Sequence, residues 1–195
     1  MDRFDAIVAR HDLNEHPFYR AWRMGTLPRA ALAAYAADYA PFIRAIEEGW
    51  RSLGDEEHAA TEREHARLWD DFRCALGAPE ADPCEQARAL ESESRRAFSD
   101  PVGALGALYA FEAQQPRTAR SKLDGLIEHY ALPESALAYF RAHADDYGEK
   151  ERLASRTTEL DAAGLARAEA SCEAVARAMW SALDGVLETV DVSSA

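Results

Sequence analysis

One glutamate, Glu112, lies inside an apolar helical run of this sequence, LGALYAFEAQQPRTARSKLDGL at residues 105–126. A buried carboxylate without a partner is so unfavourable that such groups normally pair with a cation, coordinate a metal ion or take up a proton. The fold must therefore bring a partner to Glu112. Two classes of partner are open, namely metal co-ligands and a salt-bridge cation such as Arg117 or Arg120.

The chain is predicted to be all-helical. No convincing strand pattern occurs, and alanine, leucine, glutamate and arginine, which favour helices, dominate. Helix starts are expected at Asn14–Pro17 and Thr26–Pro28, and a bend is expected at Pro116. We expect one bundle of seven or eight helices over residues 1–195, including helices over about 28–50, 55–76, 84–98, 100–129, 133–160 and 164–188.

The segment of residues 28–50 has the clearest helical pattern. Its apolar residues recur at steps of three and four, which places them on one face: Leu32, Tyr35, Tyr39, Phe42 and Ile46. We expect this face in the core, so spacing alone gives Tyr35 and Tyr39 a packing role.

Charge and composition exclude several classes of partner. The net charge is −13 and no basic stripe occurs, whereas phosphate binding needs clustered Lys and Arg, so no nucleic-acid partner is expected. No apolar run approaches the ~20 residues of a membrane helix, and the charged amino terminus does not resemble a signal peptide. The three cysteines form no CxxC pair. We expect a soluble cytoplasmic protein of one domain.

Three helices carry residues suited to a metal site. Glu62 precedes His65 by three residues and His143 precedes Asp146 by three, so each pair shares one helix face. Glu112 lies on a helix between them. Glu-x-x-His pairs and further carboxylates on facing helices are how helical bundles hold two iron or manganese ions. Carboxylates bridge hard cations, imidazoles add neutral donors, and open positions remain for dioxygen.

Each of these residues also has a plain structural interpretation. Glu62 and His65 could form a solvated surface pair, and His143 could be an ordinary surface or core histidine. A lysine at the position of Lys122 usually reaches out to the surface. The residues alone therefore leave metal binding and simple pairing equally open.

Four blocks point to a known family. NEHPFYRAWRMGTLPRAALAAYAADYAPFI, EHARLWDDFRCALG, LYAFEAQQPRTARSKLDGL and YFRAHADD occur in this order. Together they resemble the haem-oxygenase-like dimetal-oxidase superfamily, which includes thiaminase II and pyrroloquinoline-quinone synthase. Within it they most resemble the para-aminobenzoate synthases typified by the chlamydial protein associating with death domains. The resemblance covers about residues 10–160. It implies a haem-oxygenase-like bundle, two iron or manganese ions, dioxygen as co-substrate and a homodimer.

The resemblance also implies roles for single residues. Members of that group make para-aminobenzoate for folate by cutting the ring from one of their own tyrosines, which corresponds here to Tyr19. Their active-site lysine corresponds to Lys122, and Tyr35 and Tyr139 correspond to tyrosines that line the site. The implied metal ligands are Glu62, His65, Glu112 and His143.

This sequence departs from the family at one place. The family pattern is His-x-x-x-Asp-x-x-His, but the matching offsets from His143 hold Tyr147 and Lys150. A one-residue deletion would bring Asp146 and Glu149 into the two places and make an oxygen-rich site still suited to iron or manganese. The alternative is a weakened or lost second metal position, with one ion bound.

Three functions follow from these observations. The first is a self-sacrificing para-aminobenzoate synthase, and the second is a dimetal oxidase for an external small acid or amine. The third is a metal-free binding protein that retains the fold. Thiaminase II is set aside because no cysteine lies near Glu112, and pyrroloquinoline-quinone synthase because this acidic chain lacks its basic residue set.

Overall fold

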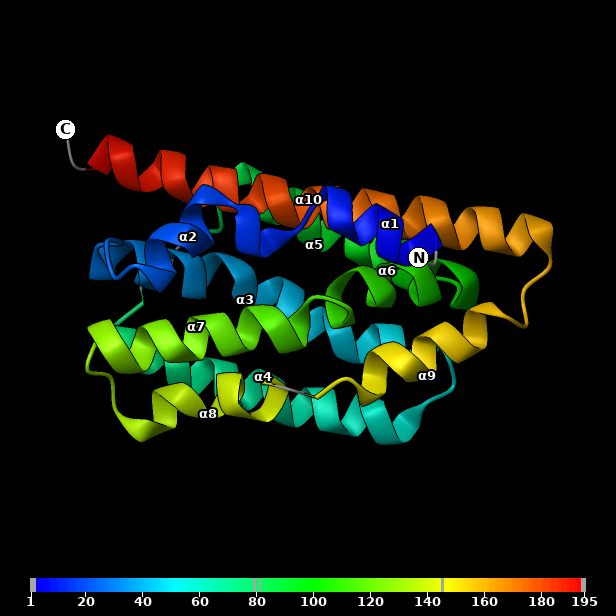
Figure 1. The fold of residues 1–195 in the computed structure, drawn as a ribbon, viewed down its shortest axis with the longest axis horizontal. Helices are drawn as coiled ribbons and strands as arrows, with labels where there is room; N and C mark the ends of the chain where they lie inside the picture. The colour runs from blue at the N-terminus through cyan, green and yellow to red at the C-terminus, as the bar shows by residue number, and fades with distance from the viewer. Residues whose placement is uncertain (1–2, 79, 81, 145, 194–195) are drawn as a thin grey trace.

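The computed structural model describes residues 3–78, 80, 82–144 and 146–193, which form helices and loops and contain no strand. The predicted all-helical class is confirmed. In Figure 1 the helices are α1 (Arg3–Arg10), α2 (Pro17–Arg23), α3 (Arg29–Ser52), α4 (Glu56–Leu76), α5 (Glu85–Phe98), α6 (Pro101–Glu112), α7 (Gln115–His129), α8 (Glu134–His143), α9 (Gly148–Thr157) and α10 (Ala162–Ser193). A short 3-10 turn, Leu13–Glu15, precedes α2.

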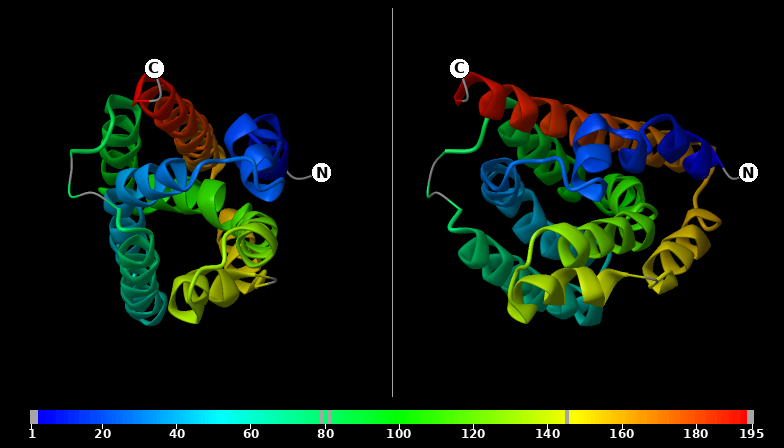
Figure 2. Two further views of the ribbon diagram at one scale, coloured as in Figure 1. Left: turned by 90° about the vertical axis from the view of Figure 1, so that its left-hand side faces the viewer. Right: turned by 60° about the vertical axis from the view of Figure 1, so that its left-hand side comes forward.

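The helices pack around two central ones, α3 and α6. The long α10 runs along one side of the bundle and packs on α5 and α6, while α4 and α8 lie along the opposite side (Figure 1). Seen from its end in Figure 2, the bundle closes through α7, which packs on α8 and on α2. Within the described residues, no helix is long and apolar enough to cross a membrane.

The helix starts follow local chemistry. His16 caps α2, because its Nδ1 accepts the N–H of Phe18 at 3.1 Å, and Pro17 occupies the first turn. The predicted face of α3 is confirmed, because all five of its apolar residues are buried. The predicted helix 55–76 is confirmed as α4, which Asp55 caps at its start and Gly77 ends in the left-handed conformation with φ of +63°.

The expected helix over residues 100–129 is broken rather than bent. Pro116 has no N–H to offer the carbonyl of Glu112, so α6 ends at Glu112 and α7 begins at Gln115. The side chain of Gln114 secures the break, since its Nε2 donates to the Ala110 carbonyl at 3.2 Å and its Oε1 accepts the Leu13 N–H at 2.9 Å. Glu112 therefore stands at a helix end inside the bundle.

The expected helix over residues 133–160 is also divided. α8 ends at His143, and α9 begins at Gly148. Asp146 favours this break because its Oδ1 accepts the N–H of Gly148 at 3.0 Å, a local bond that competes with helix continuation. As a result Glu149 enters the structure from the first turn of a new helix.

The close approach of α6 and α10 provides a test of this packing. A Cβ added at Gly106 would lie 1.9 Å from the carbonyl oxygen of Ala168, so one backbone must shift. Gly106→Ala should lower the free energy of unfolding by about 3 kcal/mol. Gly164→Ala is the control, because its nearest contact is the Asp161 side chain at 3.2 Å, and its effect should stay below about 1 kcal/mol. If urea denaturation showed an equal loss of unfolding free energy in Gly106→Ala and Gly164→Ala, this packing would be contradicted.

Candidate metal centre

Five buried or partly buried side chains from four helices meet in the interior. Glu62 and His65 come from one face of α4, and Glu112 from the end of α6. His143 is the last residue of α8, and Glu149 lies in the first turn of α9. Exposed fractions of 2% for Glu62, 1% for Glu112 and 3% for His143 show how completely solvent is excluded.

These side chains form two groups that share Glu62. One group is Glu62, His65 and His143, and the other is Glu62, Glu112 and Glu149. In each group the potential ligand atoms lie within 4.8 Å of one another. A shared carboxylate between a nitrogen-containing group and an all-oxygen group is the arrangement by which bundles hold two neighbouring hard cations.

Two orphaned atoms show that the group fits a metal ion. Glu112 Oε2 and His143 Nε2 are buried and have no hydrogen-bond partner among the described residues. His143 donates its Nδ1–H to the Tyr139 carbonyl at 2.8 Å, so the lone pair is on Nε2. Histidine ligands are commonly oriented in this way by a backbone carbonyl. The residues present therefore fit a transition-metal ion.

Electrostatics favour a cation at this place. Burial, followed by repulsion from Glu149 and Glu62, raises the pKa of Glu112 well above its usual range. Burial likewise raises the pKa of Glu149 to about 7 and lowers that of His143 to about 4. For His65 burial acts to lower the pKa, but the hydrogen bond to Glu62 and the attraction of the nearby carboxylates together raise it. A bound cation would relieve the repulsion among these carboxylates.

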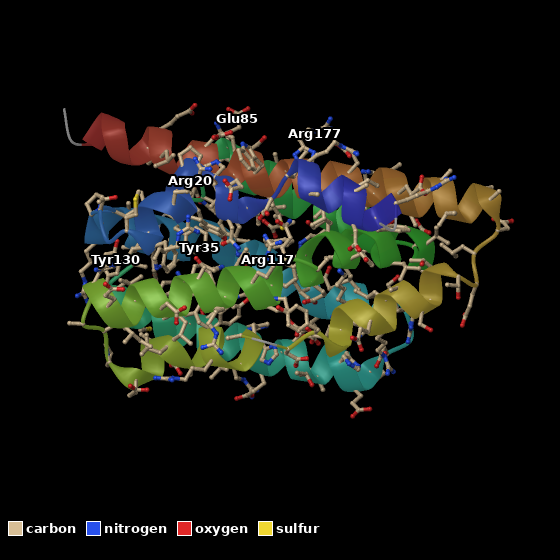
Figure 3. The ribbon with its side chains drawn as sticks, viewed as in Figure 1. Arg20, Tyr35, Glu85, Arg117, Tyr130 and Arg177 are labelled. Carbon is tan, nitrogen blue, oxygen red and sulfur yellow. The ribbon has the colours of Figure 1, made fainter. Side chains whose placement is uncertain are left out.

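A second cluster of polar groups lies beside the first. Tyr19 of α2 and Tyr35 of α3 share a hydrogen bond of 2.9 Å between their hydroxyls, and Lys122 Nζ of α7 lies 3.4 Å from each hydroxyl oxygen. The Lys122 Nζ also lies 4.7 Å from the centre of the Tyr19 ring. All three side chains are buried, at 3% exposure for Tyr19, 1% for Tyr35 and 4% for Lys122. Tyr35 is labelled in Figure 3. Burial lowers the pKa of Lys122 to about 7.

Tyr139 connects the two clusters. Its ring centroid lies 4.3 Å from that of His143 and 6.5 Å from that of His65. Its hydroxyl accepts a hydrogen bond of 2.8 Å from Gln115 Nε2. Tyr139 therefore touches the metal-ligand group with its ring and belongs to the wall of the second cluster.

The space enclosed by the second cluster is very small. A cavity of about 10 Å³ is lined by Tyr19, Tyr35, Lys122, Tyr139 and neighbours that are both apolar and polar, the polar ones including Gln114, Gln115 and Thr118. Such a volume holds one water molecule at most, whereas a cavity that takes up a benzene ring is on the order of 150 Å³. An aromatic molecule from outside does not fit beside Lys122 without large rearrangement.

Comparison with known proteins identifies the family. The family described as iron-containing redox enzymes matches residues 18–184. The chain belongs to this family. The 4-aminobenzoate synthase of Nitrosomonas europaea is 31% identical over an alignment of 225 residues that covers 94% of this chain and 89% of that protein. The 4-aminobenzoate synthase of Chlamydia muridarum is 33% identical over 171 residues, which cover 74% and 71% of the two chains.

Solved structures agree with this assignment at the level of the fold. A domain of unknown function with a haem oxygenase-like fold from Shewanella denitrificans has a TM-score of 0.83, 16% identity and coverage of 98% of this chain and 93% of its own. The haem-oxygenase-like fold that the sequence resemblance implied is confirmed. Because an enzyme family of this kind carries iron, the two ligand groups around Glu62 are the candidate iron site.

The structure places the residues of the altered run after His143 in different surroundings. Asp146 is exposed, and its Oδ1 accepts the Gly148 N–H, so it lies outside both ligand groups. Lys150 pairs with Asp5 at 2.8 Å. Of the two proposed substitutes, the structure brings only Glu149 to the ligand groups.

The structure also changes the account of Glu112. Arg117, one of the two cations considered as its partner, instead binds Asp12 at 2.6 Å. The indole N–H of Trp50 donates to Glu112 Oε1 at 3.3 Å, a contact that sequence reasoning missed. Trp50 follows Ile46 by four residues, so the apolar pattern of α3 could have placed it in the core but could not have shown its partner on α6.

Substitutions in the altered run test the ligand assignment. Glu149→Gln should weaken iron binding at least tenfold, because it removes a charged oxygen donor from the group around Glu62. Lys150→Gln and Asp146→Asn should retain the wild-type iron content, as measured by elemental analysis after loading with ferrous iron. Loss of iron in Lys150→Gln or Asp146→Asn, with iron retained in Glu149→Gln, would show that the one-residue deletion assumed after His143 is in the wrong place.

Proposed function

We propose that this protein is a self-sacrificing 4-aminobenzoate synthase that makes its product from the side chain of Tyr19. It uses dioxygen as co-substrate and two iron or manganese ions. The observation that carries the proposal is the enclosed group of Tyr19, Tyr35 and Lys122, in a cavity of about 10 Å³ beside the candidate metal ligands. A phenol ring already occupies the place where an external aromatic substrate would have to bind.

The chemistry of the product supports this choice. 4-Aminobenzoate carries an amino group and a carboxylate at opposite ring positions. In Tyr19 the same two positions carry the hydroxyl group and Cβ. The relatives in Nitrosomonas europaea and Chlamydia muridarum bear the name of this activity. The small cavity disfavours the alternative of an oxidase for an external acid or amine.

The metal ions would be held by the five interior side chains. Glu62 belongs to both candidate groups, one with His65 and His143 and the other with Glu112 and Glu149. Iron or manganese held there would supply the activation of dioxygen. Glu62, Glu112 and His143, which are at most 3% exposed, would shield the ions from bulk water.

Lys122 would supply the nitrogen atom. A protonated amine has no free electron pair, so a lysine with an ordinary pKa is a poor nucleophile at neutral pH. Burial lowers the pKa of Lys122 to about 7, so a large fraction is neutral at physiological pH. Its Nζ lies close to the hydroxyl end of the Tyr19 ring, where the amino group of the product belongs. Tyr35 orients the Tyr19 hydroxyl through their shared hydrogen bond.

Replacing Tyr19 tests the source of the ring. Tyr19→Phe should abolish 4-aminobenzoate formation and keep the iron content unchanged, because the ring is consumed and Tyr19 is not a ligand. Tyr39→Phe is a matched control, since Tyr39 is equally buried and donates its hydroxyl to the Met179 carbonyl at 2.6 Å. It should keep product formation and lose about 1 kcal/mol of stability.

Intact-mass analysis gives a direct measurement. After incubation with ferrous iron, a reductant and oxygen, the wild type and Tyr39→Phe should lose the side chain at residue 19, and Tyr19→Phe should not. Growth of a 4-aminobenzoate auxotroph on the Tyr19→Phe variant would refute the proposal and favour the external-substrate oxidase.

Replacing Lys122 tests its role and its protonation state. Lys122→Met should make no 4-aminobenzoate and keep its iron. Its free energy of unfolding at pH 7 should exceed that of the wild type by about 1–4 kcal/mol, because a buried thioether avoids the desolvation of an amine.

The pH dependence of that difference has a definite sign. Burial lowers the pKa of Lys122 from 10.5 to about 7, so between these values the unfolded chain binds the proton and the folded chain does not. The wild type therefore gains stability as pH rises through this window, and its deficit relative to Lys122→Met should shrink. A deficit that stays constant from pH 7 to 10 would contradict a neutral buried amine.

A further inference from the structure

A chain of three side chains links the candidate metal centre to the protein surface. Trp50 of α3 donates its indole N–H to Glu112 Oε1 at 3.3 Å. The Trp50 ring is stacked on the ring of His58 of α4, with 4.7 Å between centroids and 27° between planes. His58 Nδ1 in turn lies 3.0 Å from Asp55 Oδ1.

Exposure increases from Trp50 to His58. Trp50 is 0% exposed, whereas the His58 side chain is 23% exposed. Asp55 is buried behind His58 and is held by Arg152 at 2.7 Å and Arg156 at 3.0 Å, so two cations from α9 fix the residue that orients the His58 ring. One aromatic contact therefore separates the hydrogen-bond partner of Glu112 from a solvent-accessible ring.

The other three tryptophans have different surroundings. Trp69 donates its N–H to the Ala36 carbonyl at 2.9 Å, and Trp180 lies against the His16 ring with centroids 4.6 Å apart. The N–H of Trp22 has no partner in the described part of the chain. Of the four tryptophans, Trp50 is the one for which the described residues show a hydrogen bond to a carboxylate of the ligand groups.

The chemistry of indole gives this arrangement a use. Indole is one of the most easily oxidised side chains, and a hydrogen bond from its N–H to a carboxylate stabilises the positive charge that oxidation leaves. Three of the five candidate ligands, Glu62, Glu112 and His143, are at most 3% exposed, so the site is largely shielded from an electron donor in solution. An oxidisable group between the site and the surface would therefore speed the delivery of electrons.

We propose that Trp50 and His58 form an electron-entry path into the metal centre. After dioxygen has oxidised ions held by the two ligand groups, the indole of Trp50 would give one electron to that site and become a cation radical, while its N–H proton stays in the hydrogen bond to Glu112. An external one-electron reductant that docks at His58 then returns one electron to the indole. Each electron delivered oxidises one reductant by one electron, and no covalent bond forms or breaks.

The path rests on the metal-binding part of the proposed function and not on the identity of the product. It is tested on protein loaded with ferrous iron, mixed first with oxygen, which supplies an oxidant strong enough for an indole, and then with ferrocyanide, a one-electron reductant that is larger than the interior cavity. Stopped-flow absorption follows iron reduction, and elemental analysis checks that the variants carry equal iron. Trp50→Phe should reduce at least tenfold more slowly than the wild type, whereas the control Trp180→Phe should match the wild type.

A second variant keeps the test valid if Trp50→Phe does not fold. His58→Leu preserves the Trp50–Glu112 hydrogen bond and removes the outer aromatic ring, so reduction should again be slower than in the wild type. When ferrous protein is mixed with oxygen without external reductant, a transient tryptophan radical should be seen by paramagnetic resonance in the wild type and in Trp180→Phe. It should be absent in Trp50→Phe.

The outcomes separate this proposal from the proposed function. Wild-type reduction rates in both Trp50→Phe and His58→Leu would overturn the path, and so would a wild-type chain that binds no iron. A Trp50-dependent reduction in a protein that forms no 4-aminobenzoate would support the path and refute the product. Normal 4-aminobenzoate formation with Trp50-independent reduction would retain the function and refute the path.

Discussion

The mutual repulsion of three carboxylates, two of them almost completely buried, is the constraint on which the rest of this structure depends. Glu62, Glu112 and Glu149 come within ligand distance of one another, and burial and repulsion raise the pKa values of Glu112 and Glu149. Bound cations would relieve this repulsion, and the family to which the chain belongs is described as iron-containing. The helix breaks bring the candidate ligands together. Helices α6 and α8 end at Glu112 and His143, and α9 begins just before Glu149.

The environments of Glu112 and Lys122 are neighbours but favour different charge states. Around Glu112 the orphaned oxygen and imidazole nitrogen favour a cation, whereas around Lys122 the apolar and phenolic walls favour a neutral amine. Tyr139 stands between them, since its ring touches His143 and the same residue lines the cavity beside Lys122. A reaction that needs both an oxidising centre and a neutral nitrogen nucleophile can use both environments at once.

Local sequence rules predicted much of the fold. The periodic apolar face of α3 and the capped start and glycine end of α4 follow from bonds within a few residues, so they were visible in the sequence. The break after Glu112 was only partly visible. Pro116 predicted a disturbance there, but a full break also depends on Gln114 binding the backbone of Leu13, a contact 101 residues apart in the chain.

The sequence by itself determined the helical class, the pairing of Glu62 with His65 on one helix face, and the candidate ligands Glu112 and His143. The tertiary structure decided that Glu149 and not Lys150 faces the ligand groups, that Trp50 bonds to Glu112, and that only about 10 Å³ remains beside Lys122. The physical reason is the distance along the chain between the residues that interact. Helix periodicity is set by neighbours three and four residues away, whereas convergence of side chains and residual cavity volume depend on how distant helices pack.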